Sequence, residues 1–168
     1  MSFLASVVGA HPELAGYVTA PSSGHVLTPE EFCQPDRLAS AVKATGDSLH
    51  MDSSHDSAQV WFYRFVGALS LPACAAMVEE ETFADLSLDS CTITWMDPLW
   101  YTIEPQNTVE TVEDSACTYA TTVQRVIDVL TETTGTRPAP LWALAMDSPV
   151  FGLIRYGMHD FASGEGYA

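Results

Sequence analysis

The longest apolar run of the chain, VWFYRFVGALSLPACAAMV at residues 60–78, contains one charge, Arg64, and one proline, Pro72. From Ser57 onward the pattern predicts a helix, and one of its faces should enter a core: Phe62, Phe65, Val66 and Leu69. Because proline cannot donate an amide hydrogen bond, we expect a kink or a new helix start at Pro72. Each half then has about ten residues, too few for the roughly 20 that span a bilayer. The run therefore predicts core helices of a soluble protein.

A second helix is predicted before this run. TPEE at residues 28–31 supplies an N-cap threonine, a proline at the first helical position and a glutamate three residues after the cap. We expect this helix to reach about Ala44, with Pro35 bending or dividing it and Gly46 ending it. PSSGHVL, residues 21–27, is predicted to be a loop because of its Pro, Ser and Gly content.

Two short segments after the apolar run have the composition of strands. CTITW at 91–95 and LWYTI at 99–103 are rich in Thr, Ile and aromatic residues, and MDP separates them. This arrangement predicts a β-hairpin. Trp95, Trp100 and Tyr101 are core residues by type, although one face of the hairpin must point away from the helices. The fold class that follows is α+β, mainly helical with a central antiparallel β-hairpin or small sheet.

The pattern after residue 108 is again helical. Residues 109–134 predict one long helix that ends at Gly135, and five residues share its apolar face: Tyr119, Val123, Val126, Ile127 and Leu130. TRPAP at 136–140 is predicted to be a rigid connector. The remaining predicted helices are residues 2–10 with a continuation after Pro12, residues 141–146, and a short helix from Ser148 to about Tyr156.

Composition adds one strong feature, the negative charge. The 168 residues fit a single domain, residues 1–168, and six basic against 22 acidic side chains give a net charge of −16. Such a charge repels nucleic acid and anionic membrane surfaces. It favours solubility, or it attracts a cationic ligand or a basic protein partner.

Four cysteines lie far apart in the sequence, at positions 33, 74, 91 and 117, and no CxxC pair occurs. Their spacing fits no zinc or iron–sulfur motif, so we expect four reduced core cysteines and no cofactor. The first residues, MSFLASVVGAHPELAG, lack the basic start of a signal peptide. We therefore expect a cytoplasmic protein.

Familiar catalytic motifs are missing from the sequence, and two groups of residues remain as candidates. His50 and His55, beside Asp52, offer ligands for a divalent metal only if they lie on a loop, and otherwise they are polar residues of a helix start. Arg64, with Trp61 near it, is unusual in an apolar helix. Its guanidinium should reach the surface, pair with a carboxylate of residues 79–81, or face a ligand.

The order of elements resembles that of a known family. SAQVWFYRFVGALSLPACAAMV, an acidic turn, CTITWMDPLWYTIEP, a long helix and PLWALAMDSPVFGLI together resemble the FhuF-like ferric siderophore reductases, over residues 57–156. Leu141 and Trp142 match the leucine-tryptophan pair that opens a late helix in that family. The resemblance implies an iron or siderophore function. Family members that act as reductases hold a [2Fe-2S] cluster on four C-terminal cysteines, whereas this chain has no cysteine after Cys117.

The resemblance without the cluster ligands implies a protein that binds a siderophore or another small molecule, without cluster-dependent reductase activity. Arg64 would contact an anionic group of the ligand, and Tyr63, Trp95 and Tyr101 would stack against it. One alternative is a siderophore-modifying or redox enzyme with another metal set, such as His50, Asp52 and His55. Another is a small acidic scaffold or assembly factor, whose partner is a second protein or a second copy of the chain.

Overall fold

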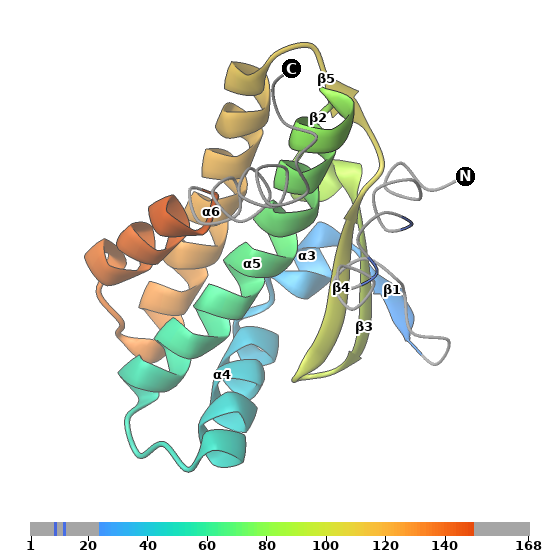
Figure 1. Cartoon of the computed structure of the whole chain (residues 1–168). Coiled ribbons are helices and arrows are strands. Elements are labelled where there is room, and N and C mark those ends of the chain that lie inside the picture. Colours follow the sequence, from blue (N-terminus) through green and yellow to red (C-terminus); the bar gives the residue numbers. More distant parts are fainter. Residues whose placement is uncertain (1–8, 10–11, 13–23, 150–168) are drawn as a thin grey trace.

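A computed structural model describes Gly9, Pro12 and residues 24–149, and it confirms a mainly helical α+β fold. A small antiparallel sheet packs on one side of a group of helices, with α5 in the middle of the molecule (Figure 1). The predictions for residues 2–10, except Gly9, and for residues after 149 lie outside the described residues.

The helix predicted from the TPEE segment is divided at Pro35, as one of the two expectations had it. It forms α3, Pro29–Phe32, and α4, Pro35–Leu49. The capping box is present, because the Glu31 amide donates to Thr28 Oγ1 at 3.2 Å and the Thr28 amide donates to Glu31 Oε2 at 2.8 Å. Local sequence was therefore sufficient to place this start.

Two expectations near α4 were wrong. Gly46 does not end the helix; α4 continues to Leu49, and His50 ends it with a left-handed backbone at φ 55°. Gly46 instead lies where α4 meets α5, since a Cβ added there would lie 2.5 Å from Ser57 Oγ. The expected loop before α3 contains a strand, β1, His25–Leu27, because this segment pairs with the hairpin.

Helix α5, Ser54–Glu80, is continuous through Pro72, so a new helix start there, one of the two expectations, is wrong. All residues from 68 to 76 are buried, so a break there would leave several backbone groups without water, whereas the proline removes one hydrogen bond. The predicted core face is confirmed, since Phe62, Phe65, Val66 and Leu69 are fully buried. Residues Ser54–Val78 are long and apolar enough to cross a membrane, but 78% of their most apolar window is buried inside the protein.

The predicted hairpin is confirmed with slightly different bounds, as β3, Cys91–Asp97, and β4, Trp100–Pro105. Strand β1 adds to β3, which gives the order β1-β3-β4, all antiparallel. Leu27, Ile93 and Ile103 pair across the three strands and are buried toward the helices. A separate two-stranded sheet joins β2, Phe83–Ala84, to β5, Thr108–Val109.

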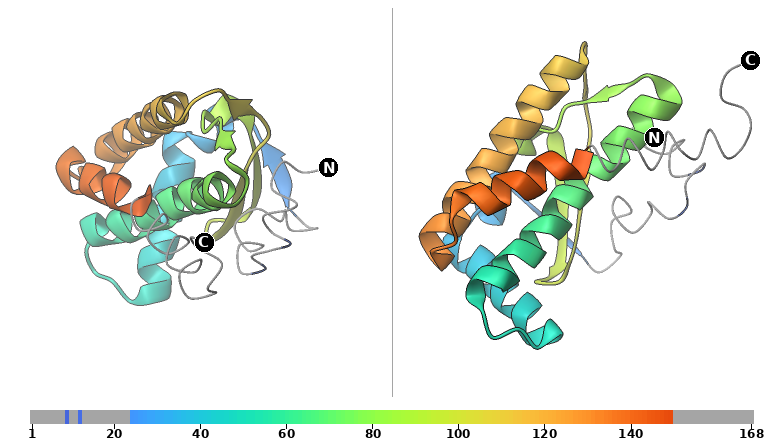
Figure 2. Two further views of the ribbon diagram at one scale, coloured as in Figure 1. Left: turned by 45° about the horizontal axis from the view of Figure 1, so that its top comes forward. Right: turned by 60° about the vertical axis from the view of Figure 1, so that its left-hand side comes forward.

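Helix α6, Val112–Thr134, begins three residues later than predicted, because Val109 belongs to β5. Gly135 ends it with φ 70°, and the five predicted core residues of its apolar face are buried. The expected connector at 136–140 is shorter, since residues 138–149 form one helix and Ser148 starts no new helix within the described part. This helix lies across α5 and α6 (Figure 2).

An aromatic cluster joins the sheet to α3 and α5. The ring of Trp61 stacks on that of Phe65 with centroids 5.8 Å apart, and Trp95 stacks on Tyr101 at 5.5 Å. Phe32 lies between the two pairs and contacts all four rings. This cluster forms the part of the core that holds the sheet against the helices.

Candidate functional site

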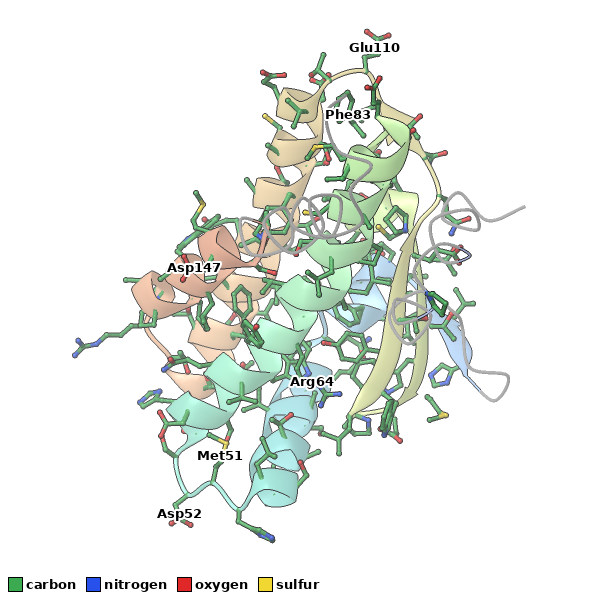
Figure 3. The ribbon with its side chains drawn as sticks, in the orientation of Figure 1. Met51, Asp52, Arg64, Phe83, Glu110 and Asp147 are labelled. Atoms are coloured by element: carbon green, nitrogen blue, oxygen red, sulfur yellow. The ribbon has the colours of Figure 1, made fainter. Side chains whose placement is uncertain are left out.

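An apolar pocket of about 150 Å³ opens where the second half of α5, the strand β2, the start of α6 and the last described helix meet. Phe83, labelled in Figure 3, marks its position near one end of the molecule. The pocket is lined by Ser70, Ala73, Cys74, Met77, Phe83, Ala84, Leu86, Val112, Ser115, Ala116, Tyr119 and Pro149.

The hydroxyl groups that line this apolar pocket are all hydrogen-bonded within the protein. Ser115 Oγ donates to the carbonyl oxygen of Ala84 at 2.6 Å, and Tyr119 OH donates to that of Ala145 at 2.7 Å. Ser70 Oγ donates to the Val66 carbonyl oxygen at 2.7 Å and lies 2.7 Å from the hydroxyl of Ser148. Among the described residues, the walls therefore have no free hydroxyl for a ligand, and the chemistry that fits them is apolar.

The one thiol of the apolar pocket has no nucleophilic character. Burial raises the pKa of Cys74 to about 11, so its thiol is protonated near neutral pH. Burial also raises the pKa of Tyr119, whose hydroxyl already donates a hydrogen bond. At neutral pH, neither group is therefore ionised for covalent or acid–base catalysis.

A larger and more polar pocket of about 380 Å³ lies at the opposite end, where the α4–α5 connection meets the end of α6. Met51 and Asp52, which line it, lie far from Phe83 in Figure 3. Lys43, which lines it, already forms an ion pair, because its Nζ lies 2.6 Å from Asp47 Oδ2.

The residues considered as metal ligands of an enzyme, His50, Asp52 and His55, do not form a metal-binding group in the structure. His50 ends α4, and His55 lies in the first turn of α5 with Nδ1 at 3.3 Å from Thr136 Oγ1. Among the residues that the structure describes, no three His, Cys, Asp or Glu side chains are grouped closely enough to hold a metal ion. The interpretation of these residues as helix-end residues agrees with their positions.

The cysteines are free thiols, but not all of them are core residues. Cys33 and Cys74 are buried, as predicted. Cys91 is half-buried, and Cys117 is exposed. The expectation was wrong for Cys117 because its position on α6 falls outside the apolar face that contains Tyr119 and Val123.

Arg64 and Tyr63 are exposed on α5, and Arg64 points toward the hairpin (Figure 3). Arg64 Nη2 donates a hydrogen bond of 2.8 Å to the carbonyl oxygen of Leu99. The guanidinium thus reaches the surface, as one of the expectations had it, and its partner is a backbone carbonyl group. Tyr63 has 52% of its surface exposed.

Trp95 and Tyr101 lie side by side in the aromatic cluster. Trp95 is 5% exposed, and the Arg37 guanidinium lies 5.3 Å from the centre of its ring. Burial raises the pKa of Tyr101, and the positive charge of Arg64 opposes this effect. Within the described part of the chain, neither of the two pockets above is lined by Arg64, Tyr63, Trp95 or Tyr101. Their role in ligand binding stays a prediction.

Sequence reasoning did not find the apolar pocket. Half of its lining comes from small side chains on three separate elements: Ser70, Ala73, Cys74, Ala84, Ser115 and Ala116. Each of them alone is an ordinary residue of a helix or a strand. The pocket exists because small residues face one another across elements that are distant in the sequence, so no local motif indicates it.

Comparisons of this chain with protein-family models, with curated proteins and with solved structures gave no match.

Proposed function

We propose that this protein is a binding protein that holds a small apolar group in the pocket between α5, β2 and α6. The observation that carries the proposal is a preformed pocket of about 150 Å³ whose lining hydroxyls are all hydrogen-bonded within the protein. A polar ligand would lose its hydrogen bonds to water there without replacement. An apolar group makes no hydrogen bonds to water, so it loses none on entering the pocket.

The volume of the apolar pocket limits the size of that group. A cavity of about 150 Å³ with apolar walls is large enough for benzene or xenon. Pockets for drug-sized ligands occupy roughly 300–1,000 Å³. The pocket therefore fits one aromatic ring or one short branched chain, and a ferric siderophore would place no more than a substituent in it. The siderophore function implied by the family resemblance remains a prediction.

A titration with toluene tests the proposal. In a ¹H–¹³C spectrum, the methyl signals of Ala73, Ala84 and Met77 should shift and saturate with toluene, and signals of the larger polar pocket should not. Toluene should also raise the melting temperature, because a ligand that binds only the folded state stabilises it.

The variant Ala116→Leu places a larger side chain at the rim of the pocket, on an exposed position of α6 where leucine is well tolerated. We expect it to weaken toluene binding at least tenfold. Ala120→Leu, an exposed position on the same helix that does not line the pocket, is the matched control and should leave binding unchanged. If toluene at its solubility limit caused no shift of the pocket methyl signals, the proposal would be overturned.

A further inference from the structure

We propose that the ligand of the apolar pocket is an organic cation, a small molecule with one apolar ring or branch and an ammonium group. The inference rests on the binding function proposed above and adds the charge of the ligand. It is based on the acidic side chains around the pocket and on the positions of the basic side chains elsewhere.

Four exposed carboxylates lie within two positions, along the chain or across the small sheet, of residues that line the pocket. Glu113 and Asp114 directly follow the lining residue Val112 at the start of α6. Glu110 follows the residue that pairs with Phe83 across the small sheet, and Figure 3 shows both near the same end of the molecule. Glu81 ends α5, two residues before Phe83. An ammonium group at the pocket mouth would therefore lie in a negative potential.

The basic side chains of the described residues do not offset this potential. None of them lines the pocket, and four have partners elsewhere. These are Arg37 on Trp95, Lys43 with Asp47, Arg64 with Leu99, and Arg125 with Glu30. The fifth, Arg137, follows the end of α6 at Thr134, which at 1.5 Å per residue is roughly 22 Å along the helix from Tyr119. Among the described residues, an anionic ligand would find no counter-charge at the pocket.

The helix dipoles do not change the sign of this potential. The start of α6 contributes about half a positive charge at the pocket, and the end of α5 contributes about half a negative charge. These two partial charges nearly cancel, because both helix ends lie beside the pocket. Within the described residues, the carboxylates therefore determine the charge that the ligand meets.

The surface around the pocket fits a small molecule better than a protein. A stable protein interface buries about 800 Å² on each partner and has an apolar centre. Of the large apolar side chains exposed in the described residues, only Val112 lines the pocket. The others are distributed over separate elements: Val26, Leu49, Tyr63, Met96, Trp100 and Met146. A single buried group with a charged end needs no such surface.

Three probes with the same ring and different charge separate the two proposals. Toluene is neutral, benzylammonium carries a positive charge and benzoate a negative charge, and all three present the same ring. At low ionic strength, benzylammonium should bind at least fivefold more tightly than toluene, and benzoate should bind more weakly than both. The preference should decrease in 0.5 M salt, because salt screens exposed charges.

The double variant Glu110→Gln/Glu113→Gln should weaken benzylammonium binding severalfold and leave toluene binding unchanged. Asp52→Asn/Glu132→Gln removes the same charge from exposed positions distant from the pocket and should change neither. Toluene binding without a preference for benzylammonium would overturn the inference and leave the binding function intact. Benzylammonium binding that Ala116→Leu does not weaken would also overturn it, since the cation would then bind outside the pocket.

Discussion

The guanidinium of Arg64 is hydrogen-bonded to the backbone of Leu99, with Nη2 2.8 Å from the carbonyl oxygen. This bond joins the first half of α5 to the turn of the β3–β4 hairpin. The same turn is held from within, because Asp97 Oδ1 accepts from the amides of Leu99 at 2.7 Å and of Trp100 at 3.0 Å. Arg64 therefore has a structural partner, which explains a charge in an otherwise apolar helix.

Arg64→Met should lower the free energy of unfolding by about 1 kcal/mol, because this hydrogen bond is exposed and so contributes less than the roughly 1.5–3 kcal/mol usual for a charged partner. Urea denaturation measures this change. Arg137→Met is the matched control, because Arg137 is exposed and has no hydrogen bond or ion pair within the described residues. Toluene binding should be the same in both variants. If Arg64→Met lost affinity for toluene at unchanged stability, Arg64 would be shown to contact the ligand.

Two tyrosine hydroxyls differ in their partners, and this difference predicts opposite effects of the same substitution. Within the described part of the chain, Tyr101 OH is buried with no hydrogen-bond partner. Tyr119 OH donates to Ala145. Tyr101→Phe should raise the free energy of unfolding by about 1 kcal/mol, because it removes an unpaired buried hydroxyl, and Tyr119→Phe should lower it by about as much. Thermal and urea unfolding of the two variants would measure this, and destabilisation by both would contradict it.

Gly46 allows the close approach of α4 to α5. Alanine is the better helix former by about 1 kcal/mol, yet its Cβ would lie 2.5 Å from Ser57 Oγ and 3.3 Å from Ser57 Cβ. Gly46→Ala should therefore destabilise the protein by roughly 1–3 kcal/mol, the usual cost of overpacking. In a double-mutant cycle measured by urea denaturation, the loss should be smaller in the Ser57→Ala background. Equal losses in both backgrounds would place the strain elsewhere.

Burial of three thiols should make the protein less stable at alkaline pH. Burial raises the pKa of Cys33 and Cys74 to about 11, and burial with the negative charge of Asp85 raises that of Cys91 to about 12. Between pH 9 and 11 the unfolded chain releases these protons and the folded chain keeps them. The free energy of unfolding then falls by roughly 1.4 kcal/mol per pH unit for each thiol. Cys74→Ala should reduce this slope, and Cys117→Ala, at an exposed thiol, should not.

Local signals in the sequence predicted the starts and ends of several elements correctly. The cap at Thr28, the stop at Gly135 and the strands of the hairpin depend on a few neighbouring residues, and each is confirmed. The errors at Gly46 and Pro72 have a different origin. Both residues are unfavourable inside a helix by themselves, and the packing of α5 against its neighbours outweighs that preference.

The candidate site was less predictable than the fold. Arg64, Tyr63, Trp95 and Tyr101 were selected because their side chains are large and capable of specific contacts. The structure uses Trp95 and Tyr101 in the core and Arg64 at a turn. The pocket comes from the absence of side-chain volume at positions such as Ala73 and Ala84, and this depends on how distant elements face one another.

The paired hydroxyls of Ser70 and Ser148 have a definite direction of donation. A serine hydroxyl has one proton, and that of Ser70 is used on the carbonyl oxygen of Val66, so the proton between the two oxygens belongs to Ser148. The two serines are therefore not equivalent. Within the described residues, removing Ser70 takes from the buried Ser148 proton the acceptor that it has, whereas removing Ser148 leaves only an unused lone pair on a hydroxyl that still donates. The contact between α5 and the last described helix thus tolerates the loss of its donor better than the loss of its acceptor.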